Sequence, residues 1–342
     1  MTNPIVLVSE FSHFAFDKAA DIAGATIIRV PCDSKKKLNL LELRKYINWY
    51  GRRNIAAIGV AAPNYPNGMP DDIEGAGKIA LENGIPCHVD ACLGGFVSMF
   101  CEDAARADFS CEGVTSICVD AHKYGLTGKG SSICVFRKSS PALPTMQYIT
   151  HEAGVYVTQG ISGSTRGEAV LELYAMLTTL GKDKWAETSR GIIKATRDLA
   201  REVNKIPGVR VLGNAEELTC GLAVELDPEF WKGKKAPDIH AIGDELATRL
   251  GAGFQYILGG FHLTLANNHV ANPAYIANFP KYLKEITETI GPEVKPTSSV
   301  GSAYFAMKQT TIFGLPVLPA VISKRIAEAA VTSIYDFRPE AT

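Results

Sequence analysis

The sequence predicts an α/β protein with a mostly parallel sheet covered by helices and a smaller α+β domain toward the C-terminus. Two observations lead to this class. In the first half of the 342 residues, short apolar runs alternate with helical stretches, a pattern typical of parallel strands joined by helices. In the second half, helical stretches dominate and the apolar runs are short.

The first half contains six apolar runs, each bounded by turn residues, and we expect each to form a strand. Ile55–Ala61 is apolar throughout, which favours a strand buried on both faces. The expected strands are Ile5–Ser9, Thr26–Val30, Ile55–Ala61, Ile85–Val89, Thr115–Val119 and Ser132–Phe136. The expected helices between them are Phe14–Ala23, Leu40–Tyr50 and Asp72–Asn83.

In the second half, Glu168–Leu180 is apolar almost all round, which predicts a buried helix. Thr165 is expected to cap its start, with Glu168 completing a capping box. A long helix over about Trp185–Lys205 should follow. The remaining expected strands lie near Val209–Leu212, Leu222–Leu226, Gln255–Ile257 and Phe261–Leu265, and the remaining helices near Ile239–Leu250, Ala274–Ile290 and Pro316–Tyr335.

Composition excludes several classes of function. Lys and Arg number 35 against 36 Asp and Glu, so the chain lacks the basic excess of nucleic-acid or membrane-surface binders. No apolar run approaches the ~18 residues of a transmembrane helix, and the first residues do not resemble a signal peptide. None of the eight cysteines has zinc-site spacing, so we expect no metal, reduced thiols and a cytoplasmic location.

Two polar clusters follow predicted strands. Asp90 ends the strand before Gly94, and Lys123 follows the strand that ends at Val119. About thirty residues separate Asp90 from Lys123, the length of one strand–helix–strand unit, so both side chains should face one crevice at the carboxyl ends of the strands.

A carboxylate and a lysine in such a crevice suit pyridoxal 5'-phosphate. The lysine forms a Schiff base, and the carboxylate keeps the pyridine nitrogen protonated. The alternative is a buried ion pair between Asp90 and Lys123. The full strings HVDACLGG and DAHKYG at this spacing favour the cofactor.

These strings resemble the sphingosine-1-phosphate lyase family of the group II pyridoxal-phosphate-dependent decarboxylase superfamily. The resembling segments are SHFAFDKAA (12–20), HVDACLGGF (88–96), TSICVDAHKYG with KGSS (115–132), GVYVTQGISGSTRG (154–167) and GSAYFAMKQTT (301–311). The resemblance implies the fold type I architecture of pyridoxal-phosphate-dependent transferases and a homodimer with active sites built between the subunits. It also implies a large cofactor-binding domain at 1–165, connecting helices at 166–206 and a small domain at 207–342.

The resemblance assigns roles to individual residues. It implies that Lys123 forms the Schiff base, Asp90 pairs with the pyridine nitrogen and His13 stacks on the cofactor ring. His122 would contact the cofactor phosphate or ring, and Lys129 would bind the substrate phosphate. From the residues alone, His13 also fits a helix start, His122 a structural hydrogen bond and Lys129 a surface position.

Three further residues match the family in the segment 154–167. The resemblance implies that Gly163 and Ser164 reach the cofactor phosphate of the neighbouring subunit and that Tyr156 is an active-site tyrosine. A helix start also presents free N–H groups to an anion, although capping alone explains the same pattern. The family's Gly-Ser-Arg appears here with Arg166 one place later, which weakens any role for this arginine.

The family's Gly/Thr-rich phosphate loop, which would precede Ile5, has no counterpart in the sequence. Without it we expect weaker cofactor binding and an exposed part of the sheet or its covering layer. The chain is therefore interpreted as an incomplete lyase or a natural short form. In a longer eukaryotic form, the location would be the endoplasmic reticulum membrane.

The expected activity is a carbon–carbon (aldehyde) lyase reaction. A phosphorylated long-chain base would be cleaved by retro-aldol chemistry to a fatty aldehyde and phosphoethanolamine. Two alternatives stay open: an amino-acid decarboxylase with the same cofactor site, and a non-catalytic relative that keeps the fold.

Overall fold

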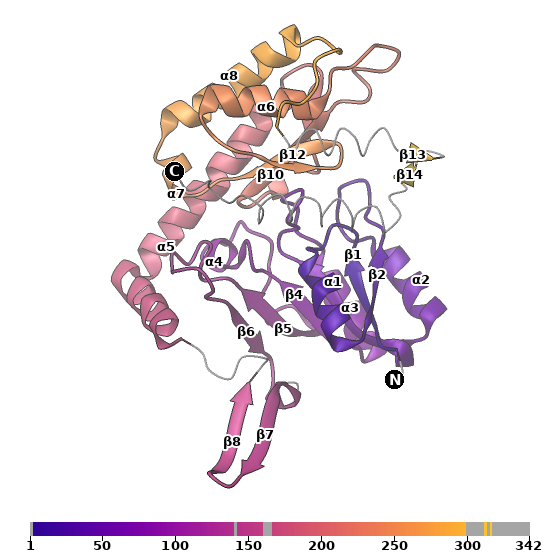
Figure 1. The fold of residues 1–342 in the computed structure, drawn as a ribbon, viewed down its shortest axis with the longest axis vertical. Coiled ribbons are helices and arrows are strands. Elements are labelled where there is room, and N and C mark those ends of the chain that lie inside the picture. Colours follow the sequence, from indigo (N-terminus) through magenta and orange to yellow (C-terminus); the bar gives the residue numbers. More distant parts are fainter. Residues whose placement is uncertain (1–2, 140–141, 160–165, 299–310, 313–314, 317–342) are drawn as a thin grey trace, which may run out of the picture.

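A computed structural model describes residues 3–139, 142–159, 166–298, 311–312 and 315–316. Its larger sheet has six strands in the order β2-β1-β3-β4-β5-β6, and all neighbours are parallel except β5 and β6 (Figure 1). These strands are β1 (Ile5–Ser9), β2 (Thr26–Val30), β3 (Ile55–Ala61), β4 (Cys87–Asp90), β5 (Val114–Val119) and β6 (Ile133–Phe136). The mostly parallel sheet predicted from the alternating pattern is therefore confirmed.

Helices connect these strands and cover the sheet: α1 (Ala15–Ala23), α2 (Leu40–Tyr50), α3 (Ile73–Asn83) and the short α4 (Gly95–Ser98). Capping explains where two of them begin: Asn39 accepts backbone N–H groups at the start of α2, and Asp72 does so for α3. Gly84, with φ +60°, ends α3 in the left-handed region. The buried core of this part includes Leu7, Ile58 and Ile79.

A second, antiparallel sheet has the order β11-β12-β10-β9. Its strands are β9 (Val209–Val211), β10 (Gly221–Leu226), β11 (Gln255–Ile257) and β12 (Gly260–Thr264). The helices α6 (Ile239–Leu250), α7 (Asn267–Val270) and α8 (Pro273–Thr289) accompany it, and a separate core includes Phe261 and Phe279. The expected α+β arrangement is found here, while the boundaries 1–165, 166–206 and 207–342 stay a prediction.

One long helix, α5 (Gly167–Val203), replaces the two expected helices and is interrupted at Gly181, where φ is +67°. The expected helix over Trp185–Lys205 corresponds to its second half, which buries one face that includes Trp185, Ile192 and Leu199. Burial of the first half, Glu168–Leu180, was predicted wrongly: Val170 is 65% exposed and Tyr174 is 68% exposed. The physical reason is that this half runs along the edge of the molecule, where one chain alone does not cover all its faces (Figure 1).

The start of α5 also differs from the expectation. The N-cap residue is Arg166, whose side chain makes no capping hydrogen bond, and Glu168 instead pairs with Arg166 at 3.2 Å. Thr165, expected as the cap, lies outside the described residues, as does the expected helix Pro316–Tyr335 apart from Pro316. Pro316 belongs to β14 (Leu315–Pro316), which pairs with β13 (Thr311–Ile312).

A hairpin absent from the expected strands projects from the body of the molecule (Figure 1). It consists of β7 (Met146–His151) and β8 (Gly154–Gln159) in antiparallel pairing. Its large apolar side chains are exposed, Val155 by 72%. No helix in the described part of the chain has the length and apolar character needed to span a bilayer.

Asp71 is a buried carboxylate that joins several loops at the carboxyl ends of β1 and β3. It accepts the backbone N–H groups of Leu38 and Ala61 at 2.8 and 2.9 Å, the Asn64 amide at 2.9 Å and the Ser9 hydroxyl at 3.3 Å. Burial raises the pKa of Asp71, and these hydrogen bonds oppose that effect. The loop that follows β3 is thus fixed around one side chain.

We expect Asp71→Asn to lower the free energy of unfolding by about 2 kcal/mol. An amide places an N–H donor against one of the backbone N–H donors, which leaves buried groups unpaired. Urea unfolding at neutral pH measures the loss. Asp72→Asn is the matched control, because Asn caps the start of α3 as well as Asp does and position 72 is exposed. Equal stability of the two variants would contradict the assignment of Asp71.

Candidate active site

Asp90 is the last residue of β4, at the carboxyl edge of the larger sheet, and is 9% exposed. Its Oδ1 accepts the backbone N–H of Cys92 at 3.1 Å and the thiol of Cys118 at 3.5 Å. Among the described residues, no hydrogen bond reaches Oδ2. One oxygen therefore anchors the side chain, and the other keeps its capacity to accept a proton donor.

Lys123 lies in the turn after β5, and the structure brings it to Asp90 through Cys92. Its Nζ is 3.0 Å from Asp120 Oδ2 and 3.2 Å from Cys92 Sγ. Burial lowers the pKa of the Lys123 amine, but Cys92 and Asp120 outweigh this and leave the pKa above its ordinary value. The two predicted residues thus converge around one cysteine, at the edge where parallel sheets bind ligands.

His122 is held on one side by the backbone. Its Nδ1 lies 2.7 Å from the carbonyl oxygen of Ser131, which can only accept, so Nδ1 carries a proton. The other ring nitrogen, Nε2, is 3.7 Å from Asp120 Oδ2. The structural hydrogen bond expected as an alternative therefore exists, and it leaves Nε2 available for a ligand.

His13 lies in the loop between β1 and α1, close to the same group. Burial lowers the pKa of His13, with Asp90 acting to raise it and Lys123 to lower it, so all three share one electrostatic environment. The His13 Nδ1 accepts the backbone N–H of Ala15 at 3.2 Å, as expected of a helix-start residue. This bond and a stacking role are compatible, because it uses a ring atom and leaves the ring faces.

A row of rings joins His13 to the second sheet. The rings of His13 and Tyr65 are perpendicular, with 5.2 Å between their centroids, and Tyr65 meets His262 of β12 at 4.6 Å. His262 Nε2 is 2.8 Å from the Gln255 side-chain oxygen. The hydroxyl of Tyr124 adds a second link, donating to the Leu265 carbonyl at 2.7 Å. Both parts of the chain thus support the same edge of the larger sheet.

His262 should make stability depend on pH. Burial lowers its pKa from 6.5 to about 4, so the unfolded chain takes up a proton at higher pH than the folded chain. Stability is therefore lost as pH falls from about 6.5 to about 4, by about 3 kcal/mol from this residue. We expect His262→Gln to remove most of that dependence in urea titrations at several pH values. His151→Gln, in the exposed hairpin, is the control, and its stability should depend on pH in the same way as that of the unchanged chain.

Two other predicted residues, Lys129 and Tyr156, are described and are not brought beside Lys123 within this chain. Lys129 is exposed in the loop after it. That loop is tied to α5, because the Gly128 N–H donates to the Glu172 carboxylate at 2.8 Å. Tyr156 lies on β8 in the projecting hairpin and is 56% exposed. Gly163 and Ser164 lie outside the described residues.

Sequence reasoning missed two residues that contact the Lys123 amine, Asp120 and Cys92. Both stand inside the quoted strings, but neither was given a role. The signal was present: Asp120 is three residues before Lys123 in a turn, and Cys92 is two residues after Asp90. Such short spacings bring side chains together when the backbone bends at a strand end.

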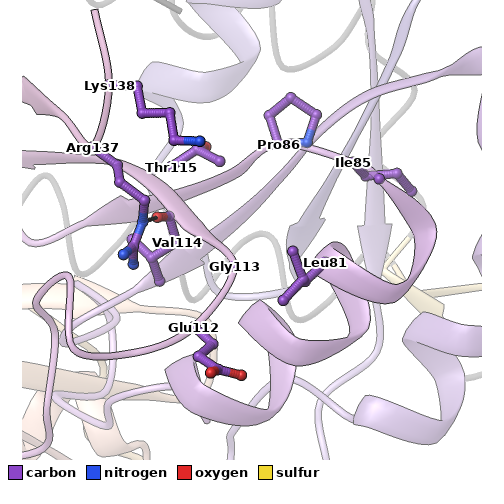
Figure 2. Close-up of a pocket in the computed structure, with 10 residues that line it drawn as sticks. Leu81, Ile85, Pro86, Glu112, Gly113, Val114, Thr115, Arg137 and Lys138 are labelled. Atoms are coloured by element: carbon purple, nitrogen blue, oxygen red, sulfur yellow. Dashed lines mark hydrogen bonds between the residues drawn. The ribbon is translucent and has the colours of Figure 1, made fainter.

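A cavity of about 470 Å³ lies at the opposite end of the strands, between the end of α3 and the starts of β4 and β5 (Figure 2). Its walls are mostly apolar. The guanidinium of Arg137, which lines the cavity, already donates hydrogen bonds to the carbonyls of Val114, Phe109 and Cys111. In the described residues, no three His, Cys, Asp or Glu side chains are grouped to hold a metal ion. The Asp90–Lys123 edge therefore remains the candidate site.

Comparison with known proteins identifies the family of the chain. The family model described as the pyridoxal-dependent decarboxylase conserved domain matches residues 1–222. A probable sphingosine-1-phosphate lyase of Legionella pneumophila is 34% identical over 87% of this chain and 50% of that protein. Sphingosine-1-phosphate lyase 1 of Rattus norvegicus is 31% identical over 90% of this chain and 53% of that protein. The chain spans about half the length of the curated relatives it matches.

A solved sphingosine-1-phosphate lyase of Burkholderia pseudomallei superposes with a TM-score of 0.79 at 25% identity. The superposition covers 98% of this chain and 68% of that chain. The family model covers well over half of the sequence, including both strand ends that carry Asp90 and Lys123. The chain therefore belongs to the pyridoxal-dependent decarboxylase family.

Proposed function

We propose that this chain carries the catalytic site of a pyridoxal-phosphate-dependent carbon–carbon lyase. Its substrates are phosphorylated sphingoid bases, cleaved to a long-chain aldehyde and phosphoethanolamine. The observation that carries the proposal is the convergence of Asp90 and Lys123 around Cys92 at one edge of the sheet. The relatives named sphingosine-1-phosphate lyases support the substrate class.

The side chains present fit pyridoxal phosphate. When bound, this cofactor supplies an electron-accepting ring. Asp90 suits its pyridine nitrogen, because the carboxylate is nearly buried and Oδ2 has no partner among the described residues. Lys123 offers a primary amine on a side chain that is 30% exposed, so the side chain is accessible to a ligand.

The proposed roles of the residues follow from their atoms. Asp90 holds a proton on the ring nitrogen, which keeps the ring able to accept electrons from the bond being broken. His13 covers one ring face, and the perpendicular contact with Tyr65 helps to fix the orientation of its imidazole. His122 contacts the cofactor through Nε2, and Lys129 binds the substrate phosphate from its exposed loop.

The direct test is a product assay with the purified chain, pyridoxal phosphate and phosphorylated sphinganine. We expect equal amounts of long-chain aldehyde and phosphoethanolamine, and none from sphinganine without its phosphate. Release of carbon dioxide from glutamate or tyrosine, with no aldehyde, would instead identify an amino-acid decarboxylase. Cofactor binding without either reaction would identify a non-catalytic relative.

We also propose that two copies of the chain form a homodimer through the first half of α5 and the hairpin. The support is that both elements expose large apolar side chains: Tyr148, Ile149, Val155, Val157, Val170, Leu171 and Tyr174. Tyr156 belongs to the same hairpin, so in this dimer it would lie at the interface and could reach the active site of the partner subunit. Gly163 and Ser164, between the hairpin and α5 in sequence, take the same route to the partner's cofactor phosphate.

Light scattering on a sizing column tests the dimer. We expect Leu171→Asp to shift the molecular mass toward a monomer, because it places a charge inside the apolar surface. Leu41→Asp is the matched control: Leu41 is 72% exposed on α2 against 68% for Leu171 on α5. A mass unchanged by Leu171→Asp, or a monomeric unmodified chain, would contradict this interface.

The eight cysteines support a reducing compartment, which we propose to be the cytoplasm. All eight thiols are free. Disulfides persist in oxidising compartments and are rare where thiols stay reduced. Fractionation of the source cells, followed by detection of the chain, tests this location; recovery from a secreted fraction would contradict it.

A further inference from the structure

Asp120 stands directly against the Lys123 amine, and the backbone fixes it there. Its own N–H donates to the Cys92 carbonyl at 3.3 Å, and its carbonyl accepts the N–H of Lys123 at 3.2 Å. The carboxylate then closes the same turn through the 3.0 Å ion pair with Nζ. The Asp120 side chain is only 15% exposed, so little water screens the pair.

The other groups around Lys123 leave Asp120 as the anion in contact with the amine. Burial raises the pKa of the Cys92 thiol to about 12, so it is neutral near pH 7. Asp90 is linked to the amine through Cys92, and Cys220 is a buried thiol that interacts electrostatically with Lys123. Two imidazoles also face this region.

The imidazoles do not replace the carboxylate. Burial lowers the pKa of His13, which favours its neutral form. His122 Nε2 is 3.7 Å from the same Asp120 oxygen, so both residues share this carboxylate. Removing Asp120 would leave the Lys123 amine without an anionic partner in direct contact among the described residues.

We propose that Asp120 is a positioning residue that keeps the Lys123 amine protonated and held against the turn until the cofactor aldehyde arrives. It thereby sets the pH at which the chain takes up its cofactor. This inference rests on the proposed function, in which Lys123 reacts with pyridoxal phosphate. In that reaction the ammonium gives up one proton to solvent, and the nitrogen adds to the aldehyde carbon. The aldehyde oxygen then leaves as water with the two hydrogens that remained on the nitrogen, so a carbon–nitrogen double bond replaces the carbon–oxygen double bond.

The experiment measures the rate at which the cofactor-free chain reacts with pyridoxal phosphate, by absorption, across a range of pH. At neutral pH we expect Asp120→Asn to react about tenfold faster, since an opposite charge in contact favours the charged amine. The midpoint of its rate–pH profile should move to lower pH. Asp120→Glu keeps the charge and should stay near the unmodified profile, while Lys123→Ala should not react.

A second measurement separates this inference from the proposed function. Formaldehyde and a mild borane reductant methylate free amines without needing a phosphate site, and mass spectrometry of the peptide gives the rate at Lys123. We expect the midpoint of the methylation rate–pH profile at Lys123 to move to lower pH in Asp120→Asn, or in Asp120→Ser if the asparagine variant does not fold. The shift without any reaction with pyridoxal phosphate would refute the proposed function and support the role of Asp120.

Two results would overturn the inference. One is a methylation profile at Lys123 that is identical in the unmodified chain and in the folded uncharged variants. The other is a uniform slowing in Asp120→Asn with an unchanged midpoint, because a residue that only shapes the turn would change the rate at every pH alike. Rescue by Asp120→Glu must accompany the shift, since the proposal depends on charge.

Discussion

Lys123→Ala is expected to abolish the absorption band that forms when the chain is titrated with pyridoxal phosphate. A Schiff base needs a primary amine at this point, and alanine supplies none. Turnover of phosphorylated sphinganine should fall below detection in the same preparation, because the cofactor loses its covalent attachment and its orientation. Absorption spectroscopy measures the band, and the aldehyde assay measures turnover in the same preparation.

Lys129→Ala is the matched control for this prediction. It removes a lysine six residues away, in an exposed loop, and should leave the absorption band in place. Because we assign Lys129 to the substrate phosphate, its loss should raise KM for the phosphorylated base. A band that survives in Lys123→Ala, or that disappears equally in both variants, would show that another amine reacts.

The larger sheet could be predicted because each strand is a short apolar run between turn residues. Ile55–Ala61 is the clearest case: its residues match the bounds of β3. The meeting of Asp90 with Lys123 follows from the same logic, since neighbouring parallel strands end at one edge. Local pattern and sheet geometry were sufficient for these features.

Other features depend on contacts that no local pattern encodes. The apolar stretch Glu168–Leu180 predicts burial, but burial needs a partner surface, and within one chain Tyr174 finds none. The contact of Tyr65 with His262 joins residues almost 200 positions apart. The hairpin β7–β8 was missed because its side chains are exposed on both faces, so its sequence lacks a strict alternation.

Asp90→Asn is expected to reduce kcat by roughly 10³-fold while leaving cofactor uptake by Lys123 intact. An amide is neutral, so it cannot hold the positive charge on the pyridine nitrogen as a carboxylate does. The ring then accepts electrons poorly when the carbon–carbon bond breaks. Kinetics on phosphorylated sphinganine, with the absorption band recorded at each cofactor concentration, separate the two effects.

The fold should tolerate this substitution for a specific reason. Both hydrogen bonds to Asp90 arrive at Oδ1, from the Cys92 N–H and the Cys118 thiol, so the amide oxygen of asparagine can take that place. The amide nitrogen then stands where Oδ2 stood and presents a donor to the ring nitrogen. Asp103→Asn, at an exposed position, controls for the loss of a charge. The variant therefore keeps the hydrogen bonds at Oδ1 and loses only the charged acceptor at Oδ2. Full activity of Asp90→Asn would contradict the proposed pairing of Asp90 with the pyridine nitrogen.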